Sequence, residues 1–250
     1  MPAKSIDDVL DRLDEIIEDN IREEQLFGAF AALYRGVTAR VKAGIATSRF
    51  EDAARMEKLD VVFANRYLEA YDQYQNGQRP TRSWQLAFDA TRSSNLLLIQ
   101  HLFLGMNAHI NLDLGIAAAQ IAPGAQIHSL ENDFMEINQL LSEMLSETQD
   151  KIGQISPLFW LLDWIGGSSD EKLADFSLKV ARDNAWRIAC RLAPLSTLDL
   201  QRQIPAIDDN VFAFGQLIQE PPGFFRSRLF RLVKWLEEKS PRKMIEVLMH

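Results

Sequence analysis

The chain has 250 residues, of which 47% are hydrophobic and 25% charged, and this composition is typical of a soluble globular protein with a sizeable core. A net charge of −8 argues against a nucleic-acid-binding protein, because contact with phosphates favours a basic surface. The single cysteine, Cys190, excludes an intramolecular disulfide and a cysteine-based zinc site.

Apolar residues at helical spacing dominate the first third of the chain. A first helix is expected after Ser5, a favoured N-cap residue, and two more before the turn at Asn76. In the third helix, Asp60 lies on the shoulder of an apolar face centred on Phe63 and Tyr67, so its carboxyl group is expected to point inward. The acidic N-terminal segment lacks the apolar stretch of a secretory signal, which predicts a cytoplasmic protein.

The segment from Leu96 to Ile121 is predicted to be the most buried helix, because it is apolar almost all the way around. His109 and Asp113 lie about 40° apart on such a helix and therefore share a face. Asn107 and Asn111 form a second pair on nearly the opposite face. A buried imidazole or carboxylate without a partner costs several kcal/mol, so each is expected to find a partner on another helix.

The second half of the chain is also predicted to be helical. A helix after Ser129 directs Asp133 to its apolar side, although an acid in a first turn also stabilises the helix dipole. In a later helix, Asn184, Arg187 and Arg191 share an inward-facing stripe. The remaining helices are expected at about 156–164, 170–192, 208–219 and 224–238.

The whole pattern favours one fold class. No alternating strand pattern of useful length, no internal repeat and no low-complexity tract is present. Many helices with short connections predict an all-α fold. We expect residues 1–250 to form a single-domain multi-helix bundle around the central buried helix.

The inward-pointing polar groups allow two interpretations. They can form a structural network, for instance with Asp113 paired to Arg187. They can also form a metal or substrate site, because a His and a carboxylate four residues apart on a helix converge on one point. The predicted ligands of magnesium, manganese or zinc are Asp60, His109, Asp113 and Asp133. The groups expected around them or around a small-molecule substrate are Tyr67, Asn107, Asn111, Asn138, Asn184 and Arg187.

The central motif also carries a family resemblance. The stretch Gly105-Met106-Asn107-Ala108-His109-Ile110-Asn111, followed by Asp113-Leu114, resembles the signature of domain-of-unknown-function family 5995. The resemblance is best between about residues 45 and 195 and includes Leu59-Asp60, Trp84, Asp133, Asn138 and Ala185-Trp186. It implies an all-α fold with a polar centre and brings no known activity with it.

Three functions are compatible with these features. The first is a metal-dependent hydrolase that acts on a small or lipid-like substrate through a metal-bound water. The second is a magnesium-diphosphate enzyme similar to class I terpene cyclases. Asn132-Asp133 and Glu136 resemble part of that family's second metal motif, but no DDxxD motif is present. The third is a non-enzymatic ligand-binding or interaction domain whose polar centre fixes the packing.

The C-terminal region is a separate feature. From Gly223 to His250 there are seven basic and three acidic residues, a local charge of +4 that leaves −12 for the rest of a chain of −8. A basic amphipathic helix can lie on an anionic membrane or dock on the acidic body of its own chain. We predict docking and no stable membrane binding, because apolar residues at helical spacing are usually core. The apolar residues on one face are Phe225, Leu229, Leu232, Val233 and Leu236.

Overall fold

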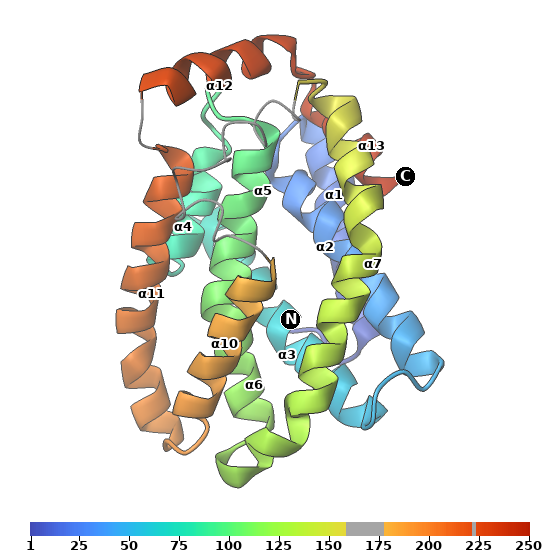
Figure 1. The fold of residues 1–250 in the computed structure, drawn as a ribbon, viewed down its shortest axis with the longest axis vertical. Coiled ribbons are helices and arrows are strands. Elements are labelled where there is room, and N and C mark those ends of the chain that lie inside the picture. Colours follow the sequence, from blue (N-terminus) through green and yellow to red (C-terminus); the bar gives the residue numbers. More distant parts are fainter. Residues whose placement is uncertain (159–177, 222–223) are drawn as a thin grey trace.

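The computed structural model describes residues 1–158, 178–221 and 224–250 (Figure 1). These residues form eleven α-helices, a π-helix and a 3-10 helix and contain no strand, which confirms the all-α prediction. The π-helix η1 spans Asn107–Leu114, and the 3-10 helix η2 spans Gly124–Leu130. The α-helices are α1 (Ile6–Glu23), α2 (Phe27–Ala46), α3 (Ala53–Gln75), α4 (Arg82–Ala90), α5 (Leu98–Met106), α6 (Gly115–Ile121), α7 (Glu131–Ile155), α10 (Leu178–Leu192), α11 (Thr197–Gln219), α12 (Phe224–Leu236) and α13 (Pro241–Met249).

Helices α5, η1 and α6 follow one another without a break and form a central rod. In Figure 1 this green rod runs through the middle of the molecule, with α4 and α11 to its left and α1, α2 and α7 to its right. The stretch Leu98–Ile121 is long and apolar enough to cross a membrane, with a mean hydropathy of 1.2, yet 78% of its most apolar window is buried inside the protein. Such burial is typical of the core helix of a folded protein, as predicted for this segment.

Two hydrophobic clusters meet at the rod. One gathers side chains of α1 to α5 and includes Tyr67 and Trp84, and the other gathers side chains of α6, α7, α10 and α11 and includes Phe134. Val37 and Phe63 pack against both clusters. The apolar packing is therefore continuous across the rod, and Asn107, His109 and Asp113 on the rod are buried.

Side-chain caps explain where several helices begin. Ser5 and Asp8 form a reciprocal capping box at α1, and the Asp52 carboxylate accepts the Arg55 N–H at the start of α3. Each of these bonds satisfies a first-turn N–H that has no acceptor within its own helix. The N-cap at Ser5 agrees with the sequence prediction.

The predicted helix beginning near Asp208 is wrong, because α11 runs unbroken from Thr197 to Gln219 with Pro205 inside it. Asp208 instead caps α4. Its carboxylate accepts the backbone N–H groups of Arg82 and Ser83 at 2.6 and 3.0 Å and the Ser83 hydroxyl at 2.6 Å. An acid in the middle of one helix thus fixes the start of another.

Replacing Asp208 with Ala is expected to lower the free energy of unfolding by about 2 kcal/mol, because two first-turn N–H groups lose their acceptor in a buried place. Urea unfolding followed by circular dichroism measures the change. Asp209→Ala is the matched control: Asp209 is an exposed acid whose partner is the Arg82 side chain, and its loss is expected to change stability by less than about 0.5 kcal/mol. Equal losses in the two variants would contradict the capping role.

The C-terminal region contains two helices where the sequence predicts one. Ser240 and Pro241 supply an N-cap and a first-turn proline, which start α13 after the break. Helix α13 packs on α1, α2 and α7, in agreement with the predicted docking. Helix α12 lies across the upper end of the bundle in Figure 1, with Val233 buried but Trp235 74% exposed. The expected absence of stable membrane binding stays a prediction.

Two predicted features fall outside the described residues. The helix expected at 156–164 is described only at its first three positions, where α7 ends at Ile155 and Ser156 follows as its C-cap. The start of the helix expected at 170–192 lies in the undescribed range 159–177, and α10 is described from Leu178 onward.

Candidate functional site

The polar motif of the rod forms a π-helix, η1, where the sequence predicts an α-helix. Turns of π-helix, with i→i+5 hydrogen bonds, are rare and occur frequently at functional sites. The wider turn still places side chains four residues apart beside each other. His109 Nδ1 lies 3.5 Å from Asp113 Oδ2, and Asn111 Nδ2 donates to Asn107 Oδ1 at 3.0 Å. Both predicted pairs are therefore present.

Asp113, only 1% exposed, accepts hydrogen bonds from two other helices. Arg66 Nε of α3 donates to Oδ1 at 2.7 Å, and Trp84 Nε1 of α4 donates to Oδ2 at 2.8 Å. Burial raises the pKa of the Asp113 carboxyl, but the Arg66 charge and the bonds from His109 and Trp84 outweigh it and leave the pKa below its ordinary value. Asp113 is therefore ionised, and its cationic partner is Arg66 instead of the suggested Arg187.

The His109 ring is enclosed by aromatic side chains. It stacks on Phe63 with ring centroids 3.6 Å apart and meets the edge of Tyr34 at 4.5 Å. Burial lowers the pKa of His109 and outweighs the opposing effect of Asp113, so the imidazole is neutral at pH 7. Because the Asp113 carboxylate can only accept, the Nδ1 atom of His109 carries the proton and Nε2 keeps a lone pair.

The Nε2 atom of His109 faces no hydrogen-bond partner among the described residues, although it is buried. His109 lines a pocket of about 210 Å³ between α2, α5 and α7, which we call the His109 pocket. Figure 1 shows α2 between the other two helices. The described lining residues are mostly apolar; Tyr34 and His109 are the titratable ones among them, and none is an acid. The pocket reaches the surface at Gln149, which is exposed.

Asp60, the other predicted acid of α3, is 7% exposed, and its buried Oδ2 has no hydrogen-bond partner among the described residues. Burial raises its pKa to about 7, and Glu57 adds to the effect. Burial also raises the pKa of Tyr34, and the charges of Asp60 and Asp113 raise it further. Asp60 thus lies in the electrostatic neighbourhood of Tyr34 and remains without a partner for one oxygen.

Asp133 serves a different part of the fold. It is 1% exposed, and its carboxylate accepts the backbone N–H groups of Glu51 and Asp52 at 2.6 and 3.1 Å and Arg55 Nη2 at 3.0 Å. These bonds fix the chain at the start of α3. An inward-pointing acid was correctly expected at this position, but its role is to hold backbone N–H groups.

The neighbours of Asp133 are engaged as well. Asn132 donates to the Glu51 side chain at 2.8 Å, and Glu136 pairs with Arg49 at 2.6 Å. Asn132 and Glu136, which resemble part of a cyclase metal motif, therefore contact the segment before α3. They do not line the His109 pocket.

The four predicted metal ligands do not come together as a metal centre. Within the described part of the chain, no group of three or more His, Cys, Asp or Glu side chains is arranged to hold a metal ion. Two of the three acids already have hydrogen-bond donors as partners. Asp113 accepts from Arg66 and Trp84, and Asp133 accepts from backbone N–H groups. Asp60, His109, Asp113 and Asp133 are all buried, but of the four only His109 and Asp113 form a pair with each other.

The remaining predicted residues divide into three places. Asn184 extends the Asn107–Asn111 pair, since its Nδ2 lies 3.4 Å from Asn111 Oδ1. These three residues and Arg187 line a second cavity, a groove between α10 and α11. Asn138 is elsewhere, where its Oδ1 accepts a hydrogen bond from Arg182 Nε. Tyr67 packs its ring 5.1 Å from that of Trp84.

Arg66 is the residue of the candidate site that sequence reasoning missed. It follows Phe63 by three positions on α3 and therefore projects toward the same side of the helix. A basic residue beside an apolar face was the available signal, because a buried carboxylate such as Asp113 needs a cation.

The comparisons with known proteins agree with the motif. Residues 6–221 match the family described as "Family of unknown function (DUF5995)". The chain belongs to DUF5995. The match also covers residues 6–44 and 196–221, beyond the part in which the resemblance is best. Neither the search of curated proteins nor that of solved structures gives a match.

The DUF5995 match contains the whole candidate site. It spans α1 to α11, and so includes the Asp113 contacts, the His109 pocket and the groove that contains Asn184. Helices α12 and α13 lie beyond it.

Proposed function

We propose that this DUF5995 protein binds a small, mostly apolar molecule in the His109 pocket, with a hydrogen-bond donor of that molecule on His109 Nε2. The proposal is carried by one observation: a buried acceptor atom without a described partner, on a side chain that lines a mostly apolar pocket. Leaving such an atom unpaired costs about 1–3 kcal/mol, and a bound donor removes that cost.

The size of the pocket limits the ligand. A dry cavity of about 150 Å³ holds a benzene molecule, so a pocket of about 210 Å³ suits a substituted aromatic ring or a short branched chain. A whole lipid is too large. Of the small or lipid-like substrates considered from the sequence, the small class is favoured.

The surroundings of His109 suit a fixed acceptor. Asp113 holds the proton on Nδ1, and stacking on Phe63 holds the plane of the ring. The position and direction of the Nε2 lone pair are therefore set before a ligand arrives, which reduces the entropy lost on binding.

Proton abstraction by the same imidazole is a second candidate function. An imidazole whose Nδ1–H faces an ionised carboxylate can accept a proton at Nε2. Binding ranks first, because catalysis usually needs several titratable groups. Among the described lining residues, Tyr34 is the one titratable side chain besides His109. A metal-dependent hydrolase or a magnesium-diphosphate enzyme would need acids in this pocket, and none of the described lining residues is one.

Binding of phenol and toluene tests the proposal, because these probes have nearly the same shape and differ by one hydroxyl donor. Calorimetry on the purified protein gives the ratio of the phenol affinity to the toluene affinity. In His109→Leu this ratio is expected to fall about tenfold, the effect of one hydrogen bond of about 1.4 kcal/mol.

His101→Leu is the matched control. His101 is also buried, but it does not line the His109 pocket. The affinity ratio is expected to stay unchanged in this variant, and circular dichroism checks that both variants fold. The proposal fails if neither probe binds the wild type at millimolar concentration, or if the ratio is unchanged in His109→Leu.

A further inference from the structure

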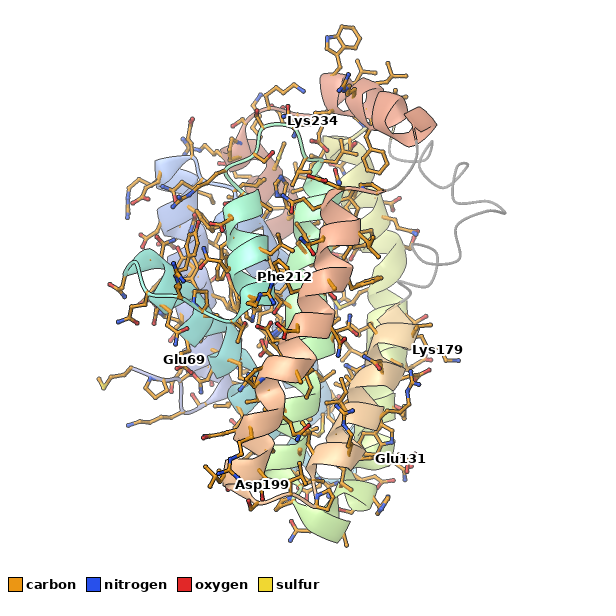
Figure 2. The ribbon with its side chains drawn as sticks, turned by 90° about the vertical axis from the view of Figure 1, so that its left-hand side faces the viewer. Glu69, Glu131, Lys179, Asp199, Phe212 and Lys234 are labelled. Atoms are coloured by element: carbon orange, nitrogen blue, oxygen red, sulfur yellow. The ribbon has the colours of Figure 1, made fainter. Side chains whose placement is uncertain are left out.

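A second cavity, which we call the amide groove, lies between α10 and α11 over η1 and shares no lining residue with the His109 pocket. Figure 2 shows α11, labelled at Asp199 and Phe212, and α10, labelled at Lys179, with the green central rod between them. The groove has a volume of about 470 Å³, within the range of about 300–1,000 Å³ that is usual for small-molecule sites. Its polar lining residues are Asn107, Asn111, Asn184, Arg187, Arg191 and Asn210.

Three asparagines form a directed chain along the floor of the amide groove. Asn107 Nδ2 donates to the Val211 carbonyl at 2.9 Å, Asn111 Nδ2 to Asn107 Oδ1 at 3.0 Å, and Asn184 Nδ2 to Asn111 Oδ1 at 3.4 Å. The direction follows from Val211, because a carbonyl can only accept and so each amide in turn must donate. Each Nδ2 has a second N–H, so the three amides offer donors as well as the remaining lone pairs of their oxygens.

Gly215 allows the three hydrogen-bonded asparagines to be anchored on α11. A Cβ at this position would lie 2.8 Å from Leu86 Cδ2 and 3.3 Å from Asn107 Nδ2. The absence of a side chain lets α11 approach the rod closely enough for the Val211 carbonyl to reach Asn107. The row of amides is therefore built into the packing of α11 on η1.

Two arginines of α10 complete the groove. Arg187 and Arg191 are exposed, line the groove, and form no hydrogen bond or ion pair with any residue that the structure describes. Asp183 lies one turn before Arg187 and makes no ion pair with it. In contrast, Arg49 and Arg66 both pair with acids of other helices. Among the described residues, no carboxylate therefore neutralises the two arginines that line the groove.

We propose that the amide groove binds a small molecule that carries a phosphate group. Arg187 and Arg191 are one helical turn apart, about 6 Å along the axis, and their two charges match a phosphate dianion. Guanidinium groups fit phosphate oxygens with paired N–H donors, and the amide floor supplies neutral donors to the remaining oxygens. The apolar wall formed by Ile188, Ile207 and Val211 suits the organic part of the molecule.

Phenyl phosphate is the probe for this proposal, measured by calorimetry at about 150 mM salt, where long-range charge effects are screened. Saturable binding is expected in the wild type. The double variant Arg187→Gln/Arg191→Gln is expected to lose at least tenfold in affinity. Asn111→Leu changes no charge and is expected to lose several-fold, because it interrupts the donor floor. Benzoate is expected to bind more weakly than phenyl phosphate, since it carries one negative charge.

The matched control is Arg22→Gln/Arg202→Gln, which removes the same charge at exposed positions of α1 and α11. The affinity of this control variant for phenyl phosphate is expected to stay within twofold of the wild-type affinity. Equal losses in the two double variants, or no saturable binding at millimolar phenyl phosphate, would overturn the proposal. His109→Leu is expected to leave phenyl phosphate binding unchanged, so the amide groove and the His109 pocket can fail separately.

The phosphate can belong to a soluble metabolite or to a lipid headgroup, and a second measurement distinguishes the two. Vesicles of phosphatidylcholine with and without phosphatidate are mixed with the protein and sedimented. Binding to the phosphatidate vesicles that is lost in Arg187→Gln/Arg191→Gln assigns the phosphate to a lipid. Binding of phenyl phosphate without vesicle binding assigns it to a soluble molecule.

Discussion

Replacing Asp113 with Ala is expected to lower the free energy of unfolding by about 3–5 kcal/mol, a large share of the stability of a typical domain. The variant leaves the Arg66 guanidinium, which is mostly buried, without its counter-charge, and leaves Trp84 Nε1 without an acceptor. The charge of Arg66, on a side chain that is 21% exposed, then has no counter-charge, and this is the most expensive part of the loss. Urea unfolding followed by tryptophan fluorescence and circular dichroism measures it.

Two further variants make this prediction specific. Asp113→Leu combined with Arg66→Met removes both charges and is expected to recover most of the lost stability, because a buried ion pair can be replaced by apolar side chains. Asp72→Ala removes an acid whose partner, Arg12, is more exposed, and is expected to lower stability by less than about 1 kcal/mol. A loss in Asp113→Ala as small as that in Asp72→Ala would contradict the central role of the Asp113 contacts.

The features of the site that the sequence predicts are those that depend on positions within one helix. His109 and Asp113 are four residues apart, as are Asn107 and Asn111, and both pairs make contact in the structure. The burial of Asp60 also follows from its place beside Phe63. Periodicity gives the side of a helix on which a residue lies, and this information survives even the change from α-helix to π-helix in η1.

The features that the sequence does not predict are contacts between helices and backbone. Asp133 and Asp208 look from their spacing like site residues or local caps, but each bonds N–H groups of a segment far away in the chain. Which remote helix begins next to a given acid depends on the packing of the whole bundle. The same is true of Arg66, whose contact with Asp113 depends on how α3 crosses the rod.

This difference explains why the described residues contain no group of metal ligands of the predicted kind. A buried carboxylate needs partners, and backbone N–H groups or an arginine satisfy it as well as a metal ion does. Sequence periodicity shows that Asp113 and Asp133 turn inward but cannot show which partner they meet. Among the predicted ligands, His109 Nε2 and Asp60 Oδ2 remain without a described partner, and these two atoms are the better guide to function.

Asp60→Asn is expected to stabilise the protein at pH 8 and to have little effect at pH 4. The pKa of Asp60 is about 7 in the folded protein against 3.8 for an unperturbed group, because burial disfavours the charged form. The protonated carboxyl favours folding, so its contribution is complete below about pH 4 and is lost as the pH rises to about 7. At pH 8 the ionised group lowers the stability by as much as about 4 kcal/mol.

Asparagine has nearly the shape of a protonated aspartic acid and does not ionise, so it removes this pH dependence. Urea unfolding at pH 4, 6 and 8 measures the difference between Asp60→Asn and the wild type, which is expected to grow with pH. Asp11→Asn, at an exposed position of α1, is the control and is expected to show no such growth. The prediction is contradicted if Asp60→Asn is no more stable than the wild type at pH 8. The ionised carboxylate of Asp60 would then have a favourable partner, such as a bound cation.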